Sequence, residues 1–259
     1  MTLKDVKCFL LYMDGTFYLG NKIFDGSLSF IDKVLETGRD FMFLTNNSSH
    51  NADFYVKRLH NMGLDVPKSK ILTSGEATAY KLNELYPGKR AFVLGNQYLI
   101  DEFTENGVCV DQDNPEIVVV GYDTTLDYAK MTRVCDLVRA GLPYIATHPD
   151  FNCPTETGFA PDIGAIMAFI EASAGRRPDL IVGKPTTGIV EAALRRTGLT
   201  TGELAMVGDR LYTDIETGLR SGMLSILVMS GETTEEMLAA SETKPDLKFN
   251  WLSDMNDLL

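Results

Sequence analysis

The sequence predicts an α/β protein with a doubly wound parallel sheet and a second, inserted α/β domain. Short apolar runs alternate with longer segments of helical periodicity, which is typical of parallel βαβ units. Several of these runs are apolar throughout, as expected for strands covered by helices on both faces. Polar residues gather directly after some of the runs, and the carboxyl ends of strands are where open α/β sheets place their sites.

The strands are expected at the apolar runs, in chain order 6–12, 41–45, 71–73, 91–94, 117–120, 144–147, 180–182, 204–207 and 225–229. Helices are expected at 27–36, which Gly38 would end, and at 189–196, between Pro185 and Gly198. A short helix is expected at the end of the chain, over 251–259.

The distribution of polar clusters predicts the domain organisation. Such clusters follow the apolar residues Tyr12, Leu44, Val182 and Val207. The middle third has its own strand and helix patterns but lacks such clusters, except for the one after Ile145. We therefore expect a discontinuous core domain of residues 1–77 and 180–259, with a cap domain inserted at residues 78–179.

Length and charge narrow the class of protein. The chain has 259 residues, 44% of them hydrophobic and 23% charged, which fits one large domain or a core with an inserted domain. Its formal net charge of −12 argues against nucleic acid or an anionic membrane surface as a partner, because both attract basic patches.

The cysteines and the first residues suggest a cytoplasmic protein. The four cysteines form no Cys-x-x-Cys pair, so reduced and mostly buried thiols are expected. The apolar run 8–13 is interrupted by Asp14 and is too short for a signal peptide or a membrane span.

Four motifs stand at the ends of predicted strands: Tyr12-Met13-Asp14-Gly15-Thr16, Thr45-Asn46-Asn47-Ser48, Gly183-Lys184-Pro185 and Val207-Gly208-Asp209-Arg210 with Asp214. Each alone has an ordinary structural explanation, such as a turn, a helix cap or a solvated surface charge. The four in this order, each at a strand end, are much harder to explain in that way.

Together these motifs resemble those of the haloacid dehalogenase superfamily, within it the sugar-phosphatase-like (NagD-type) branch with a large α/β cap. The resemblance covers nearly the whole chain, and it rests on the ordered set of motifs rather than on any one of them. It also includes the segments Phe17-Tyr18-Leu19, Ala146-Thr147-His148-Pro149-Asp150 and Leu211-Tyr212-Thr213-Asp214. It implies a Rossmann-like core and a phosphatase that uses Mg²⁺.

The resemblance also implies roles for particular residues. Asp14 would protonate the leaving oxygen and later activate water, while Thr45 and Lys184 would hold the phosphoryl group. The backbone N–H of Asn46 would contact phosphoryl oxygens beside a helix N-terminus. Gly15 and Asn47, in the same motifs, are expected in the substrate-binding set.

The implied magnesium ligands are oxygen atoms. Asp209 would bind Mg²⁺ directly through its carboxylate, and Asp14 would bind it through its backbone carbonyl. Asp214 would be a further ligand, or a nearby carboxylate that orients the ligands without binding the ion itself.

Position 12 departs from the family pattern. The first motif of the family reads Asp-x-Asp-Gly-Thr, and its first Asp attacks phosphorus to form an aspartyl-phosphate. This chain has Tyr12 there, and Asp14-Gly15-Thr16 fixes the alignment. A phenol has an ordinary pKa of about 10, so roughly one in a thousand is ionised at neutral pH. We therefore expect Tyr12 to impair turnover strongly; the change is also a single-nucleotide step from Asp, which leaves its origin open.

The cap is expected to choose the substrate, a small phosphorylated metabolite such as a sugar phosphate or nucleotide. His148 and Asp150 are the candidate contacts there, with Asn152 and Asp162 downstream. His148 could bind a sugar hydroxyl or could equally be a satisfied turn residue beside Pro149. Apolar cap surfaces in such proteins often support a homodimer.

Three functional hypotheses follow. The first is a Mg²⁺-dependent phosphatase impaired by Tyr12. The second is a silent protein that binds or senses a phosphometabolite with the same pocket. The third is a receiver-like phospho-acceptor domain, which the inserted cap and the Gly183-Lys184-Pro185 context disfavour.

Overall fold

The computed structural model of the protein describes residues 2–155 and 157–259. The Cα trace divides into two compact units. Unit 1 contains residues 1–45, 52–72 and 184–259, and unit 2 contains residues 46–51 and 73–183.

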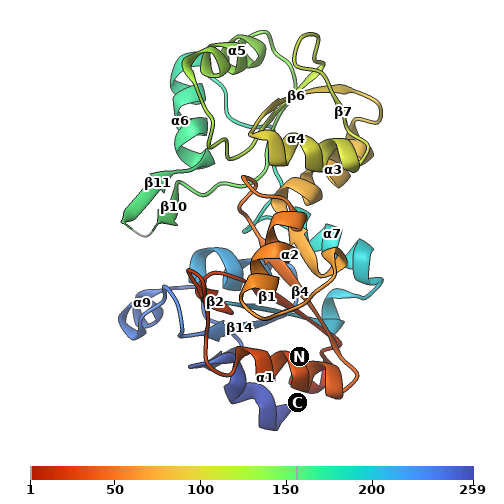
Figure 1. The fold of residues 1–259 in the computed structure, drawn as a ribbon. Helices are drawn as coiled ribbons and strands as arrows, with labels where there is room; N and C mark the ends of the chain where they lie inside the picture. Colours follow the sequence, from red (N-terminus) through yellow and green to blue (C-terminus); the bar gives the residue numbers. More distant parts are fainter. Residues whose placement is uncertain (1, 156) are drawn as a thin grey trace. The chain divides into compact units, whose positions relative to one another are not determined.

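Unit 1 is built on a six-stranded sheet with the strand order β15-β14-β13-β1-β4-β5 (Figure 1). The neighbours of β1 are both parallel to it, with Leu11 opposite Val207 on one side and Tyr12 opposite Leu44 on the other. The strands that follow β1 in the chain, β4 and β5, lie on one side of it, and the later strands β13, β14 and β15 lie on the other. This reversal of strand order makes the carboxyl end of β1 a topological switch point. The strands are β1 (Cys8–Tyr12), β4 (Asp40–Thr45), β5 (Ile71–Thr73), β13 (Leu204–Gly208), β14 (Leu224–Val228) and β15 (Leu247–Phe249).

Helices cover both faces of this sheet. Phe9, Leu11 and Phe43 share a core with apolar residues of α1, α2 and η5, whereas Met206, on the opposite face of β13, lies under Gly218 of α8. The strands are accordingly apolar on both faces, as the sequence predicted. The helical segments are η1 (Leu3–Asp5), α1 (Ser27–Glu36), α2 (Ala52–Asn61), η2 (Lys68–Lys70), α7 (Gly188–Thr197), η3 (Thr201–Glu203), η4 (Leu211–Ile215), α8 (Glu216–Arg220), α9 (Glu235–Ala240) and η5 (Leu252–Leu258).

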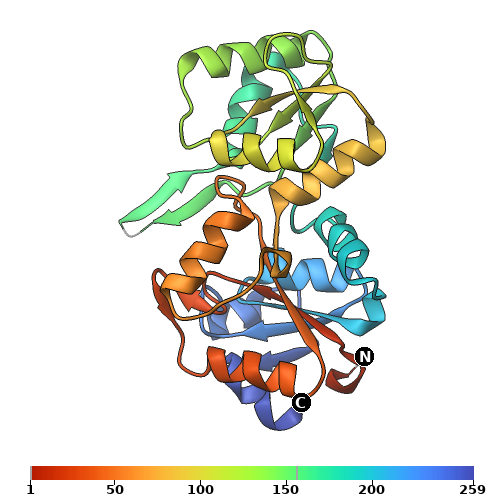
Figure 2. The ribbon, with the colours of Figure 1, turned by 45° about the vertical axis from the view of Figure 1, so that its right-hand side comes forward.

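Unit 2 has its own parallel sheet of five strands, in the order β12-β9-β8-β6-β7. Its strands share a core with α5 and α6, and the two views place α3 and α4 on the other side of the sheet (Figures 1 and 2). The elements are α3 (Ser74–Leu85), β6 (Arg90–Leu94), α4 (Gln97–Glu105), β7 (Cys109–Val110), β8 (Ile117–Val120), α5 (Tyr128–Arg139), β9 (Tyr144–Ala146), α6 (Ile163–Ala174) and β12 (Leu180–Ile181).

Side-chain caps start the helices of unit 2. Thr73, Asn96 and Asp127 each accept a hydrogen bond from a backbone N–H in the first turn of α3, α4 and α5. Asp162 does the same for α6, which then ends at Gly175 in the left-handed conformation. These caps fix where each helix begins and, with it, the direction of the preceding loop.

Two antiparallel hairpins were not predicted. The strands β2 (Tyr18–Leu19) and β3 (Lys22–Ile23) pair in unit 1, and β10 (Asn152–Thr155) pairs with β11 (Gly158–Pro161) in unit 2. Figure 2 shows the β10–β11 hairpin projecting away from the sheet of its own unit. Prolines within both of its strands disfavoured a strand prediction there.

The predicted fold class is confirmed, with parallel sheets and flanking helices in both units. The expected boundaries, after residue 77 and before residue 180, differ from those of the two units. Strand β12 hydrogen-bonds to β9 and so belongs to unit 2, which moves the second boundary to Lys184. The loop 46–51 and the start of α3 also belong to unit 2.

Cys8 and Cys135 are buried as expected, but Cys109 is exposed and Cys153 is half-buried; all four are free thiols. Among the described residues, no helix is both long and apolar enough to span a membrane.

Candidate functional site

The predicted motifs of unit 1 meet at one edge of its sheet. Tyr12 ends β1, Thr45 ends β4 and Gly208 ends β13, and these strands are adjacent and parallel. The side chains that follow them, Asp14 and Asp209, therefore lie at the carboxyl edge of the sheet beside the switch point.

Asp209 is held by several groups in a narrow space. Its Oδ1 accepts a hydrogen bond from Thr16 Oγ1 at 3.1 Å, and its Oδ2 accepts one from the backbone N–H of Glu232 at 2.8 Å. A Cβ placed on Gly15 would lie 2.4 Å from Oδ2, and one on Gly231 would lie 2.0 Å from it. Only glycine fits at these two positions while Asp209 keeps its place.

The pKa of Asp209 is raised to about 6. Burial is the main cause, because the side chain is only 2% exposed, and the nearby carboxylate of Asp214 adds to the shift. A cation beside Asp209 would relieve both effects.

Lys184 and Asp214 form a fully buried ion pair. Lys184 Nζ donates to Asp214 Oδ1 at 2.5 Å, and the two side chains are 1% and 0% exposed. The other carboxylate oxygen of Asp214 accepts a hydrogen bond from the backbone N–H of Arg210 at 3.2 Å. A Cβ on Gly208 would lie 2.3 Å from this oxygen, so Gly208 too is required for close packing.

Tyr12 lies against Lys184. The ammonium Nζ is 3.7 Å from the centroid of the Tyr12 ring, well inside the range of cation–π attraction, and the guanidinium carbon of Arg210 is 5.6 Å from the same centroid. The aromatic ring thus occupies space next to the buried cation of the site.

Asp14 contacts two side chains, Tyr18 and Arg58, to which no role was assigned from the sequence. Tyr18 Oη donates to its Oδ2 at 3.4 Å, and Arg58 of α2 lies 4.0 Å from its Oδ1. Burial raises the pKa of Asp14, and the charge of Arg58 only partly offsets this. Arg58 is itself held over the ring of Tyr18, 4.8 Å from its centroid.

Unit 2 brings together the remaining predicted residues. The side-chain amide of Asn46 donates to Asp150 Oδ2 at 3.1 Å, and that of Asn47 reaches Cys153 Sγ at 4.0 Å. His148 is completely buried, with Nδ1 3.0 Å from Thr147 Oγ1 and Nε2 3.0 Å from Asp162 Oδ1. This geometry favours the satisfied turn residue among the two interpretations of His148.

The helix expected directly after the Thr45 motif begins only at Ala52. The loop 46–51 precedes it, and Asn46 is instead fixed through its carbonyl, which accepts a hydrogen bond from Ser74 Oγ at 2.5 Å. The supposed contribution of a helix N-terminus at Asn46 is therefore not found.

The donor set around Asp209 fits Mg²⁺. Its candidate ligands are carboxylate and carbonyl oxygens, which hard cations prefer, and glycine at positions 15 and 231 puts no Cβ atom against the Asp209 carboxylate. In contrast, one carboxylate oxygen of Asp214 accepts a hydrogen bond from Lys184 and the other accepts one from the backbone N–H of Arg210. These contacts suit a residue that orients the ligands rather than one that binds the ion itself.

Comparisons with known proteins agree with this arrangement. Residues 9–109 match the family model described as haloacid dehalogenase-like hydrolase, and residues 181–255 match a HAD-hydrolase-like model. An acid sugar phosphatase of Staphylococcus aureus is 35% identical over 253 residues, covering 97% of each chain.

Solved structures agree over the same length. A 4-nitrophenylphosphatase from Thermotoga maritima is 47% identical, with a TM-score of 0.96 over 98% of both chains. NagD from Escherichia coli K-12 is 32% identical, with a TM-score of 0.89 over 96% of this chain and 98% of that one. The chain belongs to the haloacid dehalogenase-like hydrolases. Its sequence motifs therefore identified the family correctly, including the NagD-type branch.

In this haloacid dehalogenase-like hydrolase, several residues that hold Gly15, Asp209 and Asp14 in place were not predicted from the sequence. The segment Ser230 to Thr233 follows the end of β14, where Ser230 Oγ donates to the Gly15 carbonyl at 2.8 Å and Thr233 Oγ1 donates to the Asp209 carbonyl at 2.5 Å. The polar cluster after the 225–229 run was a signal of the same kind as the four motifs. Arg58 lies mid-helix and carried no such signal.

Proposed function

We propose that the protein is a Mg²⁺-dependent phosphatase of small phosphorylated metabolites, such as sugar phosphates or nucleotides, whose turnover Tyr12 strongly impairs. In this proposal unit 1 is the catalytic core and unit 2 is the cap that selects the substrate. The observation that carries it is the Tyr12 ring next to Lys184, at the edge of the sheet where Asp14 and Asp209 also lie.

The relatives support the reaction class. Those named above are an acid sugar phosphatase and a 4-nitrophenylphosphatase, and this chain matches both over almost its full length. A phosphate monoester is the substrate type that these names share.

Asp14 would be the general acid and base. Its raised pKa favours a protonated carboxyl that can donate to a leaving oxygen, and Tyr18 and Arg58 hold it in place. Lys184 and the hydroxyl of Thr45 would bind phosphoryl oxygens, since phosphoryl transfer depends on positioning and charge neutralisation. Asn46, Asn47 and Asp150 would belong to the substrate-binding set that the family resemblance implies.

Mg²⁺ would be held by the Asp209 carboxylate and the Asp14 carbonyl oxygen, with Asp214 behind them, and it would neutralise charge on the phosphoryl group. Ser230 and Thr233 support this set by binding the backbone carbonyls of Gly15 and Asp209.

Tyr12 would impair the site in two ways. It removes the carboxylate that attacks phosphorus in the family, and its ring faces Lys184 Nζ at 3.7 Å, where a phosphoryl oxygen would otherwise be neutralised. Both effects act on the chemical step and neither requires a change of fold.

A second candidate function is a phosphometabolite-binding or sensing protein. The intact Lys184–Asp214 pair and the enclosed Asp209 favour it, because these groups persist although the nucleophile is missing. This protein would bind phosphate esters with Mg²⁺ and release them unchanged.

The test is Mg²⁺-dependent hydrolysis of p-nitrophenyl phosphate by the wild type and by Tyr12→Asp. We expect turnover at least about a hundredfold faster in Tyr12→Asp, since removing a nucleophile elsewhere costs as much as about 10⁶ in rate. The double variant Tyr12→Asp/Asp14→Asn should lose about 10²–10⁴ of that gain, the usual contribution of a general acid. Equal turnover by wild type and Tyr12→Asp would contradict the proposal. Binding without hydrolysis by both proteins would favour the second candidate.

A further inference from the structure

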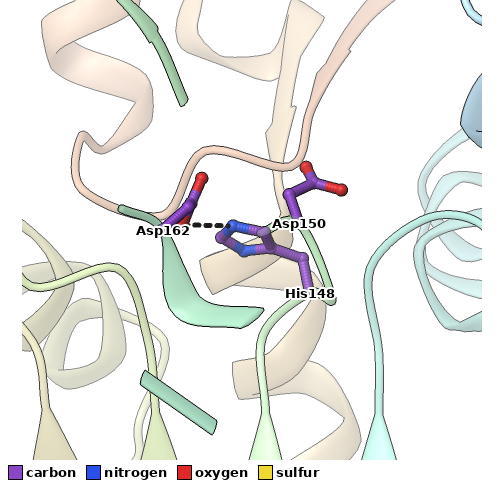
Figure 3. Close-up of side chains that lie close together, drawn as sticks. All are labelled: His148, Asp150 and Asp162. Carbon is purple, nitrogen blue, oxygen red and sulfur yellow. Dashed lines mark hydrogen bonds and ion pairs between the residues drawn. The ribbon is translucent and has the colours of Figure 1, made fainter. Parts of the chain in front are cut away.

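A cluster of three side chains in unit 2 has the composition of a transition-metal site. His148, Asp150 and Asp162 each offer one ligand atom, and these atoms all lie within 4.8 Å of one another. Figure 3 shows the imidazole of His148 between the two aspartates, with a hydrogen bond to Asp162. All three belong to unit 2, so their arrangement does not depend on unit 1.

Each member of the cluster is held by a second group. Thr147 Oγ1 lies 3.0 Å from His148 Nδ1, the Asn46 amide donates to Asp150 Oδ2 at 3.1 Å, and the backbone N–H of Ile163 donates to Asp162 Oδ1 at 2.6 Å. Metal ligands in proteins are oriented by such outer contacts. His148 Nε2 already faces one proposed ligand, Asp162 Oδ1, at 3.0 Å, while the Asn46 amide engages Oδ2 of Asp150.

The charge of the cluster favours a cation. Within residues 2–155 and 157–259, neither Asp150 nor Asp162 forms an ion pair with a lysine or arginine, and the donors to them are an amide, a peptide N–H and an imidazole. Asp162 and His148 are nevertheless 3% and 0% exposed. A buried carboxylate without a cationic partner, such as that of Asp162, is costly, and a bound metal ion is one of the usual remedies.

The tautomer of His148 can adapt to a metal. Without an ion, Nε2–H donates to Asp162 and Nδ1 accepts from Thr147. With an ion on Nε2, the proton would sit on Nδ1 and be donated to Thr147 Oγ1. Thr147 can reverse its role because its hydroxyl is 2.9 Å from Ser48 Oγ, and either of these two hydroxyls can be the donor.

One feature opposes a cation. Asp162 is the N-cap of α6, and the N-terminal end of a helix carries partial positive charge. Two carboxylates outweigh this half charge, so it weakens the site without abolishing it.

We propose that His148 Nε2 and the carboxylates of Asp150 and Asp162 bind one divalent first-row transition ion, of which Zn²⁺ is the representative. One nitrogen and two carboxylate ligands suit such an ion better than Mg²⁺, which prefers oxygen alone. The ligand atoms around tetrahedral zinc lie about 3.3 Å apart, so atoms that now lie within 4.8 Å of one another would draw closer on binding, with water as a fourth ligand. The ion fixes the turn after β9 to the start of α6 and thereby stabilises unit 2.

The experiment is calorimetric titration of chelator-treated full-length protein with Zn²⁺, in buffer containing excess Mg²⁺ so that the Asp209 region is occupied. We expect wild type to bind one equivalent, and thermal unfolding to shift upward with Zn²⁺ concentration. Asp162→Asn is the critical variant, because asparagine remains a good N-cap but is a poor metal ligand. It should bind Zn²⁺ at least about tenfold more weakly, given that even outer-shell changes cost 10- to 100-fold.

Asp127→Asn provides a matched control. Asp127 is also an N-cap in unit 2, accepting from the backbone N–H of Lys130, and it lies outside the cluster. Its replacement should leave zinc affinity unchanged. Asp209→Asn should likewise leave the single equivalent intact, which separates this site from that of the proposed function.

Circular dichroism would establish that Asp162→Asn is folded. Wild type that binds no stoichiometric Zn²⁺ would overturn the proposal. So would a folded Asp162→Asn variant with the affinity of wild type.

Discussion

In both units carboxylates gather in the segments that directly follow strands, but the two units treat these carboxylates differently. In unit 1, Asp214 has a buried lysine of its own, and glycines surround Asp209 so closely that no Cβ would fit. In unit 2, Asp150 and Asp162 are held by an amide, a peptide N–H and an imidazole. Unit 1 therefore has a buried lysine that can attract an anion, whereas the negative charge of the two aspartates in unit 2 can be balanced by a metal ion.

The largest expected effect comes from removing the cation of unit 1. Lys184→Met leaves Asp214 charged and buried, and we expect a loss of about 3–5 kcal/mol in the free energy of unfolding. Lys130→Met in unit 2 is the matched change, since Lys130 Nζ pairs with the buried Asp123 at 2.8 Å but is itself 34% exposed. Because water can replace Lys130, its loss should cost only about 1–2 kcal/mol.

Urea unfolding of both variants measures the difference. Equal losses of stability in the two variants would contradict this expectation, because they would mean that burial of the Lys184–Asp214 pair does not raise the free-energy cost of removing its lysine.

The next effect is a pH dependence in unit 1. The pKa of Asp209 is about 6 in the folded protein and near 3.8 when unfolded, so the folded state binds more protons between these values. Stability should therefore fall as pH rises from about 4 to about 6, by up to about 3 kcal/mol, and stay lower above that. Asp14, whose pKa is also raised, contributes in the same direction.

Urea unfolding in EDTA at several pH values would measure this decline, and the difference between wild type and Asp209→Asn isolates the share of Asp209. Parallel curves for the two proteins would show that burial of Asp209 has no energetic cost. Addition of Mg²⁺ at pH 7 should restore stability to wild type and not to the variant.

The smallest expected difference is the one between two glycine variants. Gly15 and Gly20 both have positive φ angles, +82° and +58°, but only Gly15 lies against Asp209. Alanine at either position costs about 1–2 kcal/mol for its left-handed backbone. Gly15→Ala should cost about 1–3 kcal/mol more, the usual penalty for overpacking, and should weaken Mg²⁺ binding. Similar losses for Gly15→Ala and Gly20→Ala, measured by thermal unfolding, would mean that Asp209 moves aside freely.

Much of the fold was predictable because the buried strands are apolar on both faces. Every predicted strand, from 6–12 to 225–229, corresponds to an observed one. The missed strands are short or lie in hairpins, such as β2 with two residues and β15 with three, where no periodicity can develop. The boundary expected before residue 180 differs by a few residues from that of the compact units, because the sequence cannot show that β12 pairs with β9.

For the candidate site, the ends of the predicted strands indicated where polar residues gather, but not which of these residues contact one another. The motifs proposed Lys184 and Asp214 for one site, and the two side chains do meet, yet their ion pair joins residues thirty positions apart, which spacing alone does not reveal. Arg58 beside Asp14 and Tyr12 over Lys184 are likewise products of tertiary packing. The roles of these residues in catalysis stay predictions.

The most direct test of the central claim is to look for a phosphoenzyme. Wild type and Tyr12→Asp, each with Mg²⁺ and p-nitrophenyl phosphate, would be quenched in acid within milliseconds and their peptides analysed by mass spectrometry. We expect a phosphate on position 12 in Tyr12→Asp, removable by hydroxylamine as an acyl phosphate should be, and none in wild type. Phosphate on Tyr12 in wild type, or turnover in Tyr12→Asp through a different residue, would contradict it.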